Sequence, residues 1–176
     1  MNYFTLFNLP EQFELDTALL TKAYQTLAQL THPDKFAASS EQEKAIAVQK
    51  KAQVNDGYQV LKSPLLRAEH MLEMRGIELR HEQQTMQDPA FLMQQMEWRE
   101  QLEELDQSND PMDVLMDLED EITSQIKGHH KQLAFLLTHQ SEQHDQQASE
   151  EVRKLKFLYK LRDEIERKED ALSDSL

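Results

Sequence analysis

The tripeptide His32-Pro33-Asp34, followed by Lys35 and Phe36, separates two helix-like segments near the N-terminus of this 176-residue chain. Pro33 cannot continue a helix, and it pushes His32 toward extended backbone. Asp34 and Lys35 carry charged side chains of the kind that seldom lies in a core. The segment therefore predicts a polar loop that ends one helix and presents a carboxylate to something outside the chain.

A helix is expected directly before this loop. Asp16 is placed to cap a helix that begins at Thr17, and Leu15 and Leu20 are spaced as a hydrophobic staple. The helix has to end before Pro33. Its apolar residues recur at helical spacing: Leu19, Leu20, Ala23, Tyr24, Leu27 and Leu30.

Two more helices are expected after the loop, and a short apolar segment, Tyr3 to Leu9, precedes the first helix. Ser40 and Glu43 have the spacing of a capping box. Ser63-Pro64 is typical of a helix start, and Gly76 of a helix stop. The apolar residues of the two helices are Val48, Ala52, Val54, Tyr58 and Leu61, then Leu65, Leu66, Ala68 and Leu72.

The second half of the chain predicts three long helices. Asp88-Pro89 and Asp110-Pro111 each place a capping residue before a proline, as at helix starts. Periodicity favours helices at about 88–107, 111–140 and 147–172. The second carries Leu115, Leu118, Ile122, Ile126, Leu133 and Leu136, and the third carries Ala148, Val152, Leu155, Tyr159 and Ile165. Such helices with short connections form an antiparallel bundle.

The predicted fold class is all-α, with two modules in an L-like arrangement. The modules are expected at residues 1–76 and 88–176, joined by a polar linker at 77–87. Their charges differ, because residues 1–76 carry a net −1 and residues 77–176 a net −13 of the total −14. This balance argues against nucleic-acid binding, which needs a basic face. Solubility alone would also explain an acidic module.

Several classes of protein are excluded or disfavoured by composition. The chain has no cysteine, which excludes disulfides, zinc-thiolate sites and cysteine-ligated iron–sulfur clusters on this chain alone. The N-terminus has no basic segment followed by an apolar one, and no apolar run is long enough to span a bilayer. We therefore expect a cytoplasmic protein that does not bind membranes.

The order of these elements resembles a J-domain, the co-chaperone module that stimulates ATP hydrolysis by DnaK-type heat-shock chaperones. The resemblance rests on Tyr3-Phe4-Thr5-Leu6-Phe7, on the His32-Pro33-Asp34-Lys35-Phe36 loop between antiparallel helices, and on Arg67-Ala68-Glu69. The C-terminal half resembles the HscB family of bacterial iron–sulfur cluster assembly through Asp88-Pro89-Ala90-Phe91-Leu92-Met93, Met96-Glu97-Trp98-Arg99-Glu100 and Arg153-Lys154-Leu155-Lys156-Phe157-Leu158. The resemblance covers nearly the whole chain. It implies two partners, an HscA-type chaperone and an IscU-type scaffold protein.

The chaperone-binding residues implied by this resemblance are His32, Pro33, Asp34 and Lys35, with Lys22 on the preceding helix. The Asp34 carboxylate would accept a charge-assisted hydrogen bond from a cation on the chaperone. Many J-domains have a strongly basic helix before the loop, whereas here Gln25, Gln29 and Thr31 occupy other polar positions. We therefore expect weak electrostatic steering toward the chaperone.

The helix at 88–107 predicts two apolar faces. At about 100° per residue, Phe91, Trp98, Leu102 and Leu105 share one line and are expected to face the core. Leu92, Met93 and Met96 lie on another side of the helix. Three glutamates lie on or beside that side: Glu100, Glu103 and Glu104. An apolar patch ringed by acids is typical of a binding surface. The resemblance assigns scaffold binding to Leu92, Met93, Met96, Glu97, Glu100, Glu103, Glu104 and Phe157.

Phe157 lies roughly 180° from the apolar stripe of its own helix. Periodicity leaves two explanations open for these misplaced apolar residues, an external patch and a buried junction with the N-terminal module. The resemblance favours the patch.

The sequence shows no catalytic constellation, so we expect no enzyme and no cofactor. His129, His130, His139 and His144 lie near Glu142 and Asp145, but they lack a metal-binding motif, and one helix would not present residues 139 and 144 together. No metal site is expected. We expect a monomer, with self-association left open. The alternatives are a general J-protein for unfolded clients and a small metal-binding helical protein.

Overall fold

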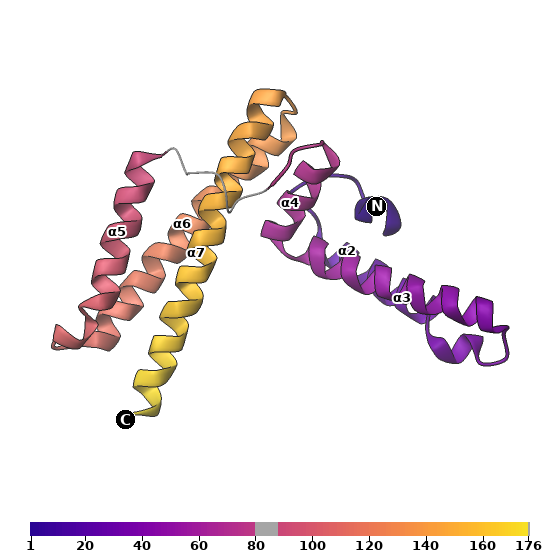
Figure 1. Ribbon diagram of the computed structural model, residues 1–176, viewed down its shortest axis with the longest axis horizontal. Helices are drawn as coiled ribbons and strands as arrows, with labels where there is room; N and C mark the ends of the chain where they lie inside the picture. Colours follow the sequence, from indigo (N-terminus) through magenta and orange to yellow (C-terminus); the bar gives the residue numbers. More distant parts are fainter. Residues whose placement is uncertain (80–87, 176) are drawn as a thin grey trace. The chain divides into compact units, whose positions relative to one another are not determined.

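The computed structural model describes residues 1–79 and 88–175, which form helices and no strands (Figure 1). The chain divides into two compact units, Met1–Glu78 and Leu79–Leu176. The predicted all-α fold class is thus confirmed. Residues 80–87 of the predicted linker lie outside the described residues. The predicted module boundaries and their L-like arrangement stay predictions.

The first unit is built on a pair of helices joined by the polar loop. It contains α1 (Tyr3–Leu6), α2 (Thr17–Leu30), the 3-10 helix η1 (Pro33–Phe36), α3 (Glu41–Lys62) and α4 (Pro64–Met74). The α2 and α3 helices run side by side (Figure 1), with the Tyr24 and Tyr58 rings stacked 4.1 Å apart. The Tyr24 hydroxyl also donates to Asn55 Oδ1 at 3.0 Å. Leu20, Val54 and Leu61 are fully buried in this unit.

The predicted helix ends of this unit are confirmed by their hydrogen bonds. Asp16 accepts from the backbone N–H groups of residues 18 and 19, and Ser40 accepts from that of residue 43. Ser63 accepts from the N–H of residue 66. Gly76 has φ +80°, and Ile77 N–H donates back to Leu72 C=O, which is a Schellman ending. Local side chains therefore determine where these helices begin and end.

Helix α1 is held against the rest of the unit at two points. A Cβ on Gly57 would come within 2.8 Å of the Tyr3 ring, so glycine permits the close approach of α1 to α3. Buried His70 accepts a hydrogen bond from the Tyr3 N–H at 3.1 Å and stacks on the Tyr3 ring. Burial lowers the pKa of His70, and the nearby N-terminal ammonium lowers it further.

Arg67 fixes the segment between α1 and α2. Its buried guanidinium donates to the carbonyls of Leu61 and Phe13 at 2.8 and 2.5 Å, and it lies 5.7 Å from the Phe13 ring centroid. These bonds satisfy a charge that would otherwise be costly to bury. The loop before α2 is thereby tied to α4.

The second unit is a three-helix bundle. It contains α5 (Pro89–Glu103), the 3-10 helix η3 (Leu105–Gln107), α6 (Pro111–Thr138) and α7 (Glu142–Asp174). Figure 1 shows α6 and α7 as an antiparallel hairpin with α5 beside it. The start of α7 was predicted five residues too late. Ser141 caps the helix by accepting from the His144 N–H, but residues 142–147 are polar and carry no helical periodicity.

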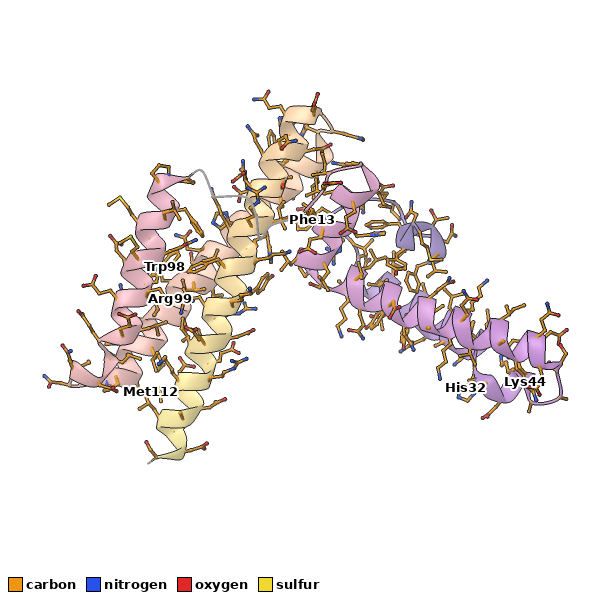
Figure 2. The ribbon with its side chains drawn as sticks, viewed as in Figure 1. Phe13, His32, Lys44, Trp98, Arg99 and Met112 are labelled. Carbon is orange, nitrogen blue, oxygen red and sulfur yellow. The ribbon has the colours of Figure 1, made fainter. Side chains whose placement is uncertain are left out.

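The predicted core of this bundle is largely confirmed. The predicted α6 residues and Ala148, Val152, Leu155 and Ile165 of α7 are all buried, whereas Tyr159 is half-buried. Leu158 and Leu161 are also buried, because α7 packs against α5 as well as α6 and so needs a wider apolar face. Trp98 extends from α5 into the bundle (Figure 2) and donates to Glu121 Oε1 of α6 at 3.0 Å.

Some apolar residues of the first unit are not core residues. Leu19 and Leu30 of α2 are 53% and 55% exposed, and Val48 of α3 is 61% exposed. Each lies at the edge of its helix's apolar stripe, where the neighbouring helix does not cover it.

Candidate functional site

The His32-Pro33-Asp34 segment forms a tight turn rather than an irregular loop. His32 has extended backbone and caps η1, because its Nδ1 accepts from the Asp34 N–H at 3.2 Å. In this bond Nδ1 is the acceptor, which leaves Nε2 as the ring nitrogen that faces away from the turn backbone. Pro33 occupies the first position of η1, where its fixed φ fits the turn. In Figure 2, His32 and Lys44 mark this end of the first unit.

The Asp34 carboxylate is available to a partner. Its side chain is 92% exposed, and one oxygen lies 3.5 Å from His32 Nδ1. The turn therefore fixes the backbone of Asp34 and leaves its carboxylate mostly in water. A charge-assisted hydrogen bond to this group requires no rearrangement of the segment.

The outward face of α2 is nearly uncharged. It consists of Ala18, Leu19, Lys22, Gln25, Thr26, Gln29 and Leu30, all of them exposed. Lys22 is the single charge among these seven residues. Thr31, predicted as another polar surface position, is 7% exposed, and its hydroxyl donates to Leu27 C=O. Weak positive steering from this face is thus consistent with the structure.

In the second unit, α5 presents an apolar surface that we call the α5 patch: Leu92, Met93 and Met96. These side chains are 39%, 64% and 72% exposed. On the opposite side of the helix, Phe91 and Trp98 are 4% and 2% exposed. The prediction of one core face and one outward apolar face on this helix is therefore confirmed.

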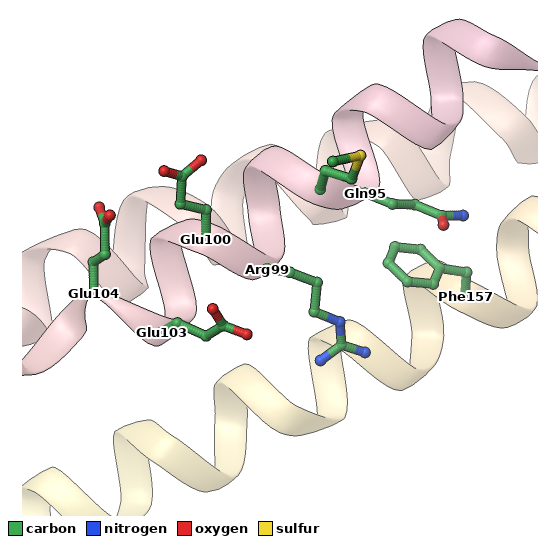
Figure 3. Close-up of a pocket in the computed structure, with 7 residues that line it drawn as sticks. Gln95, Arg99, Glu100, Glu103, Glu104 and Phe157 are labelled. Carbon is green, nitrogen blue, oxygen red and sulfur yellow. The ribbon is translucent and has the colours of Figure 1, made fainter.

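Acidic residues lie along one side of the α5 patch. Glu97, Glu100, Glu103 and Glu104 are all exposed. Next to them lies the α5–α7 groove, a hollow of about 580 Å³ lined by Gln95, Met96, Arg99, Glu100, Glu103, Glu104 and Phe157. Figure 3 shows Glu103 directed toward α7, while Glu100 and Glu104 point away from it. The structure thus brings Met96, three of the predicted glutamates and Phe157 to one groove.

Phe157 differs from the expectation of a simple surface residue. It is half-buried, its ring stacks with Trp98 at 6.3 Å, and the Phe91 ring meets it edge-on at 5.9 Å. The Arg99 guanidinium lies 5.7 Å from its centroid. Phe157 lies off the main stripe of α7 because it packs under α5. It therefore supports the groove from below as well as lining it.

Three residues of this region were missed from the sequence. Gln95 and Arg99 line the groove, and Glu164 of α7 binds Arg99 through an ion pair of 2.5 Å. Arg99 lies among acidic residues on α5, and a lone cation there was the available signal. Glu164 gave none, because it is one of many charges on α7 and is 65 positions away in sequence.

The N-terminus of α5 is fixed to α7 by Asp88. This residue accepts from the Phe91 N–H at 3.1 Å and from Lys154 Nζ at 2.7 Å. The Lys154 ammonium, followed by the backbone donors, holds the pKa of the Asp88 carboxyl below its ordinary value. The α5 patch therefore begins on a helix whose first turn is anchored.

The histidines of α6 and α7 make contacts within the helix hairpin. His130 bonds the Tyr159 hydroxyl at 2.8 Å, and His129 pairs with Glu151. The rings of His139 and His144 are 6.3 Å apart, so the structure does bring them together, because the connection between α6 and α7 separates the two residues along the chain. Within residues 1–79 and 88–175, no group of three or more His, Cys, Asp or Glu could hold a metal ion. In the same ranges, no helix combines the length and apolarity needed to cross a membrane.

The comparisons agree with this architecture. The family model described as the HSCB C-terminal oligomerisation domain matches residues 87–166. A curated relative, the "Co-chaperone protein HscB homolog" of Pseudoalteromonas atlantica, is 60% identical over 174 residues, which cover 99% of each chain. The solved structure of HscB from Vibrio cholerae is 45% identical with a TM-score of 0.85, covering 98% of this chain and 99% of that one.

A more distant structure gives the same picture. Human co-chaperone HscB is 28% identical with a TM-score of 0.85, covering 96% of this chain and 82% of that one. A helical pair joined by the His32-Pro33-Asp34 turn, followed by a three-helix bundle, defines a J-domain co-chaperone. Within that class, the chain belongs to the HscB co-chaperone family.

Proposed function

We propose that this protein binds an IscU-type iron–sulfur scaffold, delivers it to an HscA-type chaperone and stimulates the ATPase of that chaperone. Its role would be to aid the maturation and transfer of iron–sulfur clusters. The observation that carries the proposal is the presence of two different exposed sites on two units. One is the Asp34 carboxylate, and the other is the α5 patch with its acidic groove.

On the chaperone side, Asp34 binds a cationic group, while Pro33 and His32 hold the turn in place. Loss of one partner from a desolvated charged pair typically costs about 2–5 kcal/mol. Lys22 and Lys35 are both exposed and contribute modest positive charge. The exposed Leu19 and Leu30 on the same face of α2 add apolar area that a chaperone surface can cover.

On the scaffold side, Leu92, Met93 and Met96 provide the apolar centre of the interface. Phe157 forms the floor of the adjoining groove, and Glu97, Glu100, Glu103 and Glu104 form an acidic rim. Interfaces with a buried apolar centre and a charged rim are common among specific complexes. The partner surface is accordingly apolar with basic side chains around it.

A protein that bridges two partners raises the effective concentration of each at the other. Coupling between the scaffold and the chaperone then requires no chemistry from this chain. We therefore propose a cytoplasmic co-chaperone without catalytic activity or cofactor. The family model matched here is described as an oligomerisation domain, but our expectation of a monomer stays a prediction.

Calorimetric titration of a purified IscU-type scaffold tests the scaffold half of the proposal. We expect saturable binding to the scaffold and none to a chemically denatured protein. Binding to both would favour a general J-protein for unfolded clients. The chaperone half is tested by the steady-state ATPase of an HscA-type chaperone with the scaffold present. An unchanged turnover on addition of this protein would contradict the co-chaperone role.

A further inference from the structure

Arg99 occupies an unusual place for a cation beside an acidic binding surface. It projects from α5 toward α7, and its guanidinium ends beside Phe157 (Figure 3). Nη1 of Arg99 and Oε2 of Glu164 are 2.5 Å apart. Both side chains remain partly exposed, at 44% and 42%. The groove therefore contains a cation whose position is determined by a carboxylate on the facing helix.

Arg99 has an alternative partner on its own helix. Glu103 lies four residues further along α5, at the spacing of a helical ion pair, although the order with the cation first is less favourable than the reverse. Glu100 and Glu104 also line the groove with Arg99. Among the described residues, Arg99 nevertheless pairs with Glu164 and with none of these three glutamates.

This choice of partner determines the charge of the groove. Glu164 compensates the charge of Arg99, so that Glu100, Glu103 and Glu104 keep their negative charge for a partner. If Glu164 were absent, the guanidinium would turn to Glu103 and would compensate one of the groove carboxylates. A cationic side chain from the partner would then meet less negative potential.

The geometry points to Glu164 as a positioning residue that holds Arg99 away from the acidic rim and so keeps the groove selective for a partner with a basic side chain beside its apolar contacts. This inference rests on the proposed binding of an IscU-type scaffold. Rim charges act mainly on the association rate and on its salt dependence. The effect of Glu164 is therefore expected in the association rate constant rather than in folding.

Stopped-flow association with an IscU-type scaffold tests this role. At low salt, Glu164→Gln is expected to lower the association rate constant about threefold and to flatten its salt dependence. Glu166→Gln is the matched control, because it removes the same charge from an exposed position on α7, whereas the ion pair of Arg99 is with Glu164. It is expected to change the rate by less than about 1.5-fold.

Substitution of Arg99 separates positioning from charge alone. In an Arg99→Gln background, Glu164→Gln should change the association rate by less than about 1.5-fold, because no cation remains to be positioned. A threefold loss that persists in this background, or an equal loss in Glu166→Gln, would overturn the inference. Circular dichroism of each variant confirms that the bundle is folded. Absence of scaffold binding by the unsubstituted protein would instead overturn the proposed function, and with it this inference.

Discussion

The turn at His32-Pro33-Asp34 and the α5–α7 groove differ in size and in the chemistry that they offer to a partner. The turn offers one carboxylate, that of Asp34, which is 92% exposed and lies in the 3-10 helix Pro33–Phe36. The groove collects its residues from two helices and combines apolar side chains with several glutamates. A single charge at a fixed point suits a transient contact, whereas an extended apolar and acidic surface suits selection of one partner. The two sites should therefore respond differently to substitution and salt.

The largest effect is expected at the turn. Asp34→Asn should reduce stimulation of an HscA-type ATPase to the level without this protein, because an amide cannot replace the charge-assisted acceptor. Steady-state ATPase turnover with the scaffold present measures this. Asp56→Asn, at an exposed position of α3, is the matched control and should stimulate normally. Equal loss in both variants would show that general charge, not the turn, matters.

The next largest effect is expected at the α5 patch. Met96→Ala removes a side chain that is 72% exposed, so it should weaken scaffold binding by about 2 kcal/mol, roughly thirtyfold, while changing folding stability by less than about 0.5 kcal/mol. Calorimetry and thermal unfolding measure the two quantities. Met116→Ala, at an exposed methionine of α6, is the control and should bind normally. A large stability loss in the Met96 variant would make Met96 a core residue instead.

Substitution of Phe157 should affect both folding stability and scaffold binding. Phe157→Ala removes a half-buried ring that contacts Phe91 and Trp98, so we expect a loss of roughly 2 kcal/mol in unfolding free energy together with weaker scaffold binding. Denaturant unfolding, followed by fluorescence of Trp98, the single tryptophan, measures the stability term. Unchanged stability would mean that Phe157 acts at the surface alone.

A smaller effect is expected from salt, which should slow binding at the groove more than it changes the action of the turn. The groove is acidic, whereas the outward face of α2 carries Lys22 as its single charge. Raising ionic strength from about 0.05 to 0.5 M should slow scaffold association about tenfold. Chaperone stimulation at saturating scaffold should change less than about twofold. Equal salt dependence of the two rates would contradict the proposed division of charge.

The smallest effect concerns the first unit alone. Its folded state lowers the pKa of His70, so below the ordinary histidine value of about 6.5 the unfolded chain binds more protons than the folded one. Stability should therefore fall as the pH drops from 7 to 5.5. His70→Gln retains an acceptor for the Tyr3 N–H, and its Tm should fall less over this range. An equal fall in Tm for both proteins would contradict the role of His70 in this pH dependence.

Local signals were sufficient to predict most of the fold. Asp16, Ser40, Ser63 and Gly76 each determine a helix end through bonds to residues within five positions, so their roles are visible in the sequence. The turn was predictable for the same reason, because its function depends on consecutive residues. Its 3-10 geometry and the hydrogen bond to His32 were not apparent.

Contacts between distant residues account for what was missed. Phe157 lies off the stripe of α7 because α5 covers it, and the Arg99–Glu164 pair joins residues 65 positions apart. The exposure of Leu19 and Leu30 likewise depends on which helix faces are left uncovered. Periodicity gives the direction of a side chain on its own helix, but it does not give the neighbour that the side chain meets.

The central claim is that the turn and the groove act separately on two partners. Calorimetric titration of an IscU-type scaffold into the Asp34→Asn variant, beside the unsubstituted protein, tests it most directly. The claim predicts the same Kd within about twofold, although this variant no longer stimulates the chaperone. A scaffold affinity at least tenfold weaker in Asp34→Asn would contradict it, because the turn would then belong to the scaffold site.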